Sequence, residues 1–107
     1  MNNRLLSMLG LCMKAGKLKS GEFQTEAAVK SGDAFLVILA TDASFNTKKK
    51  FNDMCTFYET PVIEYETKES LARAIGKEER AMLAVCDEGF AGSIHKLYTQ
   101  LNNNSED

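Results

Sequence analysis

The chain has 107 residues, 44% of them hydrophobic, so we expect one compact domain that needs neither disulfides nor a metal ion to fold. Its 13 Lys and Arg against 15 Asp and Glu give a formal net charge of −2, so total charge gives no bias toward polyanions unless the cations gather on one face. Ser7 and Lys14 interrupt the apolar N-terminal stretch, and no run reaches the roughly 18 apolar residues of a membrane span. These features predict a cytoplasmic protein with no membrane partner.

The three cysteines, Cys12, Cys55 and Cys86, are far apart in the sequence and form no C-x-x-C pair. A single histidine is too few for a common zinc site. Because free cysteine behaves as a small hydrophobic residue in protein cores, we expect reduced, buried thiols. No metal ion or cofactor is predicted.

The first two predicted helices flank a short connection. The first helix ends at Gly16, a residue suited to a left-handed C-cap, and Lys17 to Ser20 follow as a connection or edge strand. Gly21 and Glu22 open the second helix, which ends at Gly32. The pattern of the first helix consists of apolar residues at helical spacing: Leu5, Leu6, Leu9, Cys12 and Met13.

Six consecutive apolar residues, Phe35 to Ala40, form the most hydrophobic predicted strand. Such a strand is buried on both faces, which requires a layer of helices on each side of the sheet. The elements that follow are a helix from Asn46 to Tyr58, a strand at Val62–Tyr65, a helix at Lys68–Ile75 capped by Thr67, a charged loop at Lys77–Arg80, a strand at Met82–Cys86 and a helix at Phe90–Leu101.

Helices and strands alternate along the whole chain. This order favours an α/β fold, specifically an α/β/α sandwich of three layers. We assign residues 1–101 to a single domain. Residues 102–107 form a polar C-terminal tail that we expect to be frayed.

Two aspartates raise the possibility of an enzyme. Asp42 and Asp87 each follow an apolar strand and precede a helix, so two carboxylates at one sheet edge would hold Mg²⁺. The alternative, which we favour, is that each aspartate caps the following helix or closes a turn. The sequence contains no phosphate-binding glycine loop and no nucleophile elbow. We therefore predict no catalytic residue and no small-molecule substrate.

Polar and cationic residues precede or begin three of the predicted helices. If the strands run nearly parallel, these loops share one edge of the sheet, where lysines and free backbone N–H groups would suit phosphates. The residues of this predicted edge are Lys17, Lys19, Ser20 and Gly21 before the second helix, Ser44 and Lys48 at the third, Lys68 at the fourth, and Lys77 and Arg80 after it.

Four segments together carry a resemblance to a known family: LGLCMKAGKLKSGE, LVILATDASFNTKKK, LARAIGK and AVCDEGFA. In this order and spacing they resemble the kink-turn RNA-binding ribosomal protein family called L-seven-Ae, in its short bacterial YlxQ-like branch. The resemblance covers about residues 5 to 100. It implies an α/β/α sandwich with a mixed four-stranded sheet, no enzymatic activity, and binding of a sharply bent internal-loop RNA.

The resemblance also indicates where this chain differs from its family. A Gly-x-Asn-Glu-x-x-Lys pattern reads tandem sheared G·A pairs in the family, and it falls here on Gly21, Phe23, Gln24 and Ala27. Only the glycine is kept. A good polar base contact is worth ~1 to 3 kcal/mol of discrimination, so we expect altered specificity. Phe23 either stacks on a base or packs inward against the domain.

The leading hypothesis is a non-enzymatic protein that binds structured RNA, with ribosomal RNA or the ribosome as candidate partners. The alternative is a protein-interaction module that kept the scaffold and lost RNA binding. The predicted RNA-binding residues are Lys19, Ser20, Gly21, Phe23, Gln24, Ser44, Lys48, Lys68, Lys77 and Arg80.

Overall fold

The structure, a computed structural model, describes residues 3–104. In this range five helices alternate with four strands, in the predicted order. The elements are α1 (Arg4–Lys14), β1 (Leu18–Ser20), α2 (Glu22–Lys30), β2 (Leu36–Leu39), α3 (Phe45–Phe57), β3 (Val62–Glu64), α4 (Lys68–Ala74), β4 (Met82–Val85) and α5 (Glu88–Asn104).

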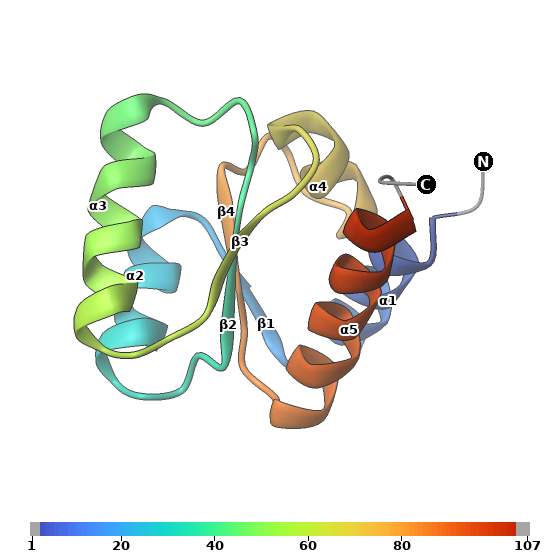
Figure 1. The fold of residues 1–107 in the computed structure, drawn as a ribbon, viewed down its shortest axis with the longest axis horizontal. Coiled ribbons are helices and arrows are strands. Elements are labelled where there is room, and N and C mark those ends of the chain that lie inside the picture. The colour runs from blue at the N-terminus through green and yellow to red at the C-terminus, as the bar shows by residue number, and fades with distance from the viewer. Residues whose placement is uncertain (1–2, 105–107) are drawn as a thin grey trace.

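The four strands form one mixed sheet in the order β1-β4-β2-β3. β2 and β3 are parallel, whereas β4 runs antiparallel to both of its neighbours, β1 and β2. β1, β2 and β3 therefore point in one direction and end at one edge of the sheet, and β4 begins at that same edge. This is the upper edge in Figure 1.

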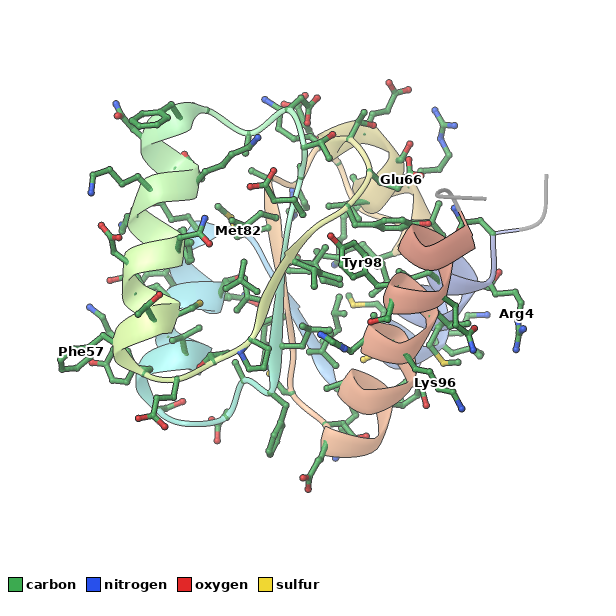
Figure 2. The ribbon with its side chains drawn as sticks, viewed as in Figure 1. Arg4, Phe57, Glu66, Met82, Lys96 and Tyr98 are labelled. Atoms are coloured by element: carbon green, nitrogen blue, oxygen red, sulfur yellow. The ribbon has the colours of Figure 1, made fainter. Side chains whose placement is uncertain are left out.

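Helices cover both faces of the sheet, as the α/β/α prediction requires. Figure 1 shows α2 and α3 on one face and α1, α4 and α5 on the other. Successive residues of a strand point to opposite faces, so Leu36 and Ile38 pack toward α1, α4 and α5 while Val37 and Leu39 pack toward α2 and α3. Figure 2 shows the same division, with Met82 on the α2–α3 side and Tyr98 between the sheet and α5.

Several element boundaries differ from the sequence predictions, most clearly those of β2 and the last helix. β2 begins at Leu36, and Phe35, predicted inside the buried strand, is 42% exposed although its N–H donates to the Val85 carbonyl. The last helix continues to Asn104, three residues beyond Leu101, since no Gly or Pro interrupts the chain there. That part of the predicted frayed tail is therefore helical, and residues 105–107 lie outside the described range.

Side chains cap four of the five described helices. The cap of α1 is Asn3, that of α3 is Ser44, that of α4 is Thr67 as predicted, and Asp87 accepts from the Phe90 N–H at the start of α5. α2 differs, because it begins at Gly21 and has no side-chain cap. Among the residues described, no helix is long and apolar enough to span a bilayer.

Candidate nucleic-acid interface

The start of α2 lies at the upper edge of the sheet and leaves its first turn open. Gly21 has φ +90° and ψ 163°, a conformation that essentially only glycine adopts, and its N–H donates to the Met82 carbonyl over 3.1 Å. With no side-chain oxygen at the cap position, the next N–H groups of the first turn face outward without an intrahelical partner. A helix start of this kind attracts anions such as phosphate.

Arg80 fastens the loop between α4 and β4 to this helix start. Its Nε donates to the Ser20 hydroxyl over 3.2 Å, and its Nη1 donates to the carbonyls of Glu78 and Glu79 over 2.8 and 3.0 Å. Ser20 and Arg80 are 60 residues apart in the sequence. The charged loop at Lys77–Arg80 and the start of α2 are therefore one structural unit.

A hollow of about 450 Å³ lies between the start of α2, α3 and this loop. Phe23 and Gln24 line it from α2, Thr47 from α3, and Glu79 and Arg80 from the loop. Phe23 is 85% exposed, so the alternative in which it packs inward is wrong. An exposed phenylalanine beside a guanidinium offers a flat apolar surface next to a positive charge.

Ser44 and Lys48 are also at the upper edge, but intramolecular contacts occupy both side chains. Ser44 Oγ accepts from the Thr47 N–H over 3.1 Å and caps α3. Lys48 Nζ donates to the Thr41 carbonyl over 2.7 Å and pairs with Glu64 at 3.2 Å, which ties the loop after β2 to the end of β3. Both residues hold the edge in shape rather than present a free group.

Lys50 on α3 neutralises two carboxylates of α2. Its Nζ lies 2.8 Å from a Glu22 oxygen and 3.2 Å from a Glu26 oxygen. Hydrogen bonds from Lys30 and then Lys50 lower the pKa of the Glu26 carboxyl, while those to Glu22 and Glu26 raise the pKa of Lys50. The acidic first turn of α2 is therefore compensated beside the hollow.

The remaining predicted cations of the edge have no such partner. Lys68 donates its backbone N–H to Asp42 Oδ1 over 2.9 Å, but its side chain makes no ion pair, and the same holds for the exposed Lys77. Several cationic side chains form no ion pair with any carboxylate of residues 3–104. They include Lys17 and Lys19, before and on β1, and Lys68, Lys77 and Arg80 at the upper edge.

Asp42 and Asp87 lie at opposite edges of the sheet, because β2 and β4 are antiparallel. Asp87 caps the helix that follows it, whereas Asp42 caps α4 through Lys68, not the following α3. The hypothesis of a shared Mg²⁺ site is wrong for this reason. Within the described residues, no group of three or more His, Cys, Asp or Glu is arranged to hold a metal ion.

One exposed aromatic residue at this edge was missed by the sequence reasoning. Phe45 is the first residue of α3 and is 78% exposed. The predicted helix begins one residue later, at Asn46, and leaves Phe45 without a role. The available signal was its position, because it is six residues before the buried Phe51 and therefore out of phase with the inner face of α3.

The sequence of this chain matches a known protein family. The sequence model of the Ribosomal protein L7Ae/L30e/S12e/Gadd45 family matches residues 3–95. The chain belongs to this family. Membership confirms the predicted resemblance and places the chain in a non-enzymatic family of RNA-binding proteins.

Two proteins similar in sequence come from bacteria. The chain is 42% identical over 90 residues to the RNA-binding protein YlxQ of Bacillus subtilis (strain 168), which covers 84% of this chain and 90% of the relative. It is 38% identical over 94 residues to the RNA-binding protein YlxQ of Enterococcus faecium, covering 88% and 90%. These matches confirm the predicted YlxQ-like branch.

Solved structures show the same L7Ae-type sandwich. A protein with unknown function from Bacillus halodurans C superposes with a TM-score of 0.87 at 43% identity, covering 90% of this chain and 97% of that one. A Giardia lamblia 15.5kD RNA binding protein superposes with a TM-score of 0.71 at 20% identity, covering 91% and 92%. The second likeness shows the shared fold alone.

Proposed function

We propose that this protein binds structured RNA of the kink-turn type through the upper edge of its sheet, with a specificity that differs from that of relatives with the full family pattern. The single observation that carries the proposal is the uncapped start of α2. Its first turn lines the same hollow as Arg80, whose guanidinium makes hydrogen bonds but no ion pair in the described residues, and as the exposed Phe23. Donors and cations suit phosphates, and the aromatic ring suits an unstacked base.

The expected difference in specificity follows from the side chains at the hollow. Phe23 offers neither donor nor acceptor to a guanine edge, and Gln24 is a neutral amide that accepts less strongly than a carboxylate. Lys68, Lys77 and the backbone of α2 would still hold the phosphates, which carry no sequence information by themselves. We therefore expect recognition by shape and stacking, with a weakened preference for sheared G·A pairs.

The partner class is taken from the family and from relatives described as RNA-binding proteins. Ribosomal RNA, free or within the ribosome, is the proposed target, and the cytoplasm is the proposed place of action. The competing function is a protein-interaction module on the same scaffold. Exposed aromatic side chains away from the upper edge, such as Phe57 at the end of α3, would serve such a module (Figure 2).

The deciding experiment is a binding titration of the purified chain against a kink-turn RNA and against the same RNA with its G·A pairs replaced, each at two salt concentrations. Preference for the intact kink-turn, or salt-sensitive binding of both RNAs, supports the proposal. The first outcome would show that G·A recognition persists, and the second that phosphate contacts dominate. Absence of binding to either RNA would favour the protein-interaction module.

Replacing Phe23 tests the assigned stacking surface. We expect Phe23→Ala to weaken RNA binding about tenfold or more, since base–aromatic stacking is worth ~1–3 kcal/mol. Phe23→Trp should retain affinity. Phe57→Ala is the matched control, because Phe57 is similarly exposed, at 79%, but lies at the far end of α3. Equal affinities of the Phe23 and Phe57 variants would remove Phe23 from the interface.

A further inference from the structure

A second hollow, of about 630 Å³, runs along the outer face of α2 beside the edge strand β1. We call it the α2 groove. Its floor is made by small residues of α2 and the turn after it, including Ala27, Ala28 and Gly32, and by Cys86. Phe23 lines it near the start of α2 and Phe35 near the end, so two partly or fully exposed phenylalanine rings flank small side chains.

Two lysines form the β1 side of this groove. Lys17 and Lys19 both line it, and their spacing of two residues places them on the same face of the sheet, opposite the buried Leu18. Neither ammonium is within ion-pair distance of a carboxylate in residues 3–104. The acidic residue of the groove, Asp33, accepts a hydrogen bond from the Ser31 hydroxyl over 2.9 Å.

The α2 groove adjoins the hollow at the upper edge. Phe23 and Gln24 line both, so the two hollows lie next to each other and share the exposed Phe23 side chain as a wall. Aromatic surfaces alternating with unpaired cations along a groove are the arrangement by which proteins bind single-stranded nucleic acid. A helix of nine residues is about 13 Å long, which corresponds to about four stacked nucleotides.

We propose that the α2 groove binds an unpaired RNA segment that extends from the structured element held at the upper edge, with bases against Phe23 and Phe35 and phosphates near Lys17 and Lys19. This inference rests on the proposed function and deepens it, because it predicts that the target RNA carries a single-stranded extension next to its bent element. An acidic peptide would also pair with the two lysines, but its carboxylates would gain little from contact with two separated aromatic rings.

The first test compares RNAs with and without the extension. A kink-turn RNA with an unpaired extension of about four nucleotides, at the 5′ or the 3′ end, is compared with the blunt RNA and with the same extension base-paired. We expect one unpaired extension to raise affinity about tenfold. Equal affinities for all the RNAs, or an equal gain from the paired extension, would overturn the proposal.

Two variants test whether the gain in affinity comes from the α2 groove. Phe35→Leu keeps an apolar side chain at a position that is 42% exposed, yet it should remove most of the gain, and Lys17→Gln should reduce it. Both residues lie at the edge of the sheet opposite the upper edge, where the Phe35 N–H donates to the Val85 carbonyl and the Cys86 N–H donates to the Lys17 carbonyl. The prediction that Lys17 belongs to the upper edge is therefore wrong, and affinity for the blunt RNA should stay the same in both variants. The matched controls are Phe57→Leu and Lys49→Gln, on α3. A gain that survives both groove substitutions would contradict the assignment.

Cys86 gives a readout that does not depend on the kink-turn. It lines the groove and is only partly buried, whereas Cys12 and Cys55 are buried. Burial raises the pKa of all three thiols, to about 11 for Cys12 and Cys55. At about pH 8.5, maleimide should label Cys86 first, and a short single-stranded RNA should slow that labelling several-fold. An acidic peptide of equal charge is the control competitor.

These outcomes separate the two proposals. Protection of Cys86 by single-stranded RNA, without binding of the kink-turn, would retain the groove and reject the proposed function. Binding of the kink-turn, without protection and without a gain from the extension, would do the reverse. Protection by the acidic peptide alone would make the α2 groove a protein-docking site and overturn the RNA assignment.

Discussion

Thr25 is a buried residue whose polar side chain affects the stability of the domain. It lies on the inner side of α2 and is fully buried, the one buried polar residue within the described range. Its hydroxyl has no hydrogen-bond partner in the described part of the chain. Burying a hydroxyl without a partner costs about 1–3 kcal/mol. Thr25 is therefore a position where the native side chain lowers stability.

We expect Thr25→Val to raise the free energy of unfolding by about 1 kcal/mol, because valine has the same branched shape without the unpaired hydroxyl. Urea denaturation measures the change. Thr56→Val on the exposed side of α3 is the control and should shift stability little. A Thr25→Val protein less stable than the native chain would mean that the hydroxyl has a partner in solution.

At the scale of the elements, the start of α4 is held by two caps from different parts of the chain. Thr67 Oγ1 accepts from the Ser70 N–H over 3.1 Å, and Asp42 Oδ1 accepts from the Lys68 N–H over 2.9 Å. The second bond joins the loop after β2 to the helix after β3. The upper edge therefore owes part of its shape to hydrogen bonds among its own loops.

Removing either cap should loosen this junction. Thr67→Ala and Asp42→Ala should each lower the free energy of unfolding by about 1 kcal/mol. Because both act on the first turn of α4, the double variant should lose less than the sum of the single losses. Urea denaturation of the three variants measures these losses, and Thr56→Ala is the control because Thr56 is an exposed threonine within α3. Strict additivity would show that the two caps stabilise separate units.

Local signals in the sequence were sufficient for the elements but not for their directions. Helix order, the Thr67 cap and the buried strand from Leu36 follow from residues close together in the chain. The strand ends LVILATDASF and MLAVCDEGF look alike, yet β2 and β4 run in opposite directions. Strand direction depends on pairing partners, and no local pattern records those partners.

The same limit applied to the candidate site. Sequence reasoning placed Gly21, Lys68 and Arg80 near one another, and the structure brings them to one edge. Sequence reasoning did not show that Lys50 pairs with Glu22, 28 residues away. Nor did it show that Lys48 donates to the Thr41 carbonyl and pairs with Glu64. Free and paired lysines have the same letter in a sequence, so only tertiary contacts tell them apart.

For the whole molecule, the distribution of cations matters more than the net charge of −2. The cations of α3 form ion pairs with carboxylates of α2, α3 and β3. The unpaired ones near the proposed interface come from β1, α4 and the loop before β4. The upper edge therefore combines cations that form no ion pair with acidic side chains such as Glu78 and Glu79, and total composition does not show this arrangement.

This distribution limits how strongly salt can weaken RNA binding. Five cations without an ion pair at the upper edge and α2 groove predict a slope of log affinity against log salt no steeper than about −4.5. Lys77→Gln should make the slope shallower by about one, and Lys49→Gln, which removes a paired lysine, should leave it unchanged. A steeper slope would mean that RNA reaches cations on other faces.

The reversed direction of β4 also determines which segments would have to be swapped to transfer an RNA preference from one family member to another. Because β4 starts where β1, β2 and β3 end, four short segments meet at one edge: residues 20–24, 41–48, 66–69 and 77–81. A chimera that takes only these segments from another family member would keep the hydrophobic core of its host except at the position of Ala43. The fold thereby separates the part of the chain that evolution can vary for a new RNA from the part that it must retain.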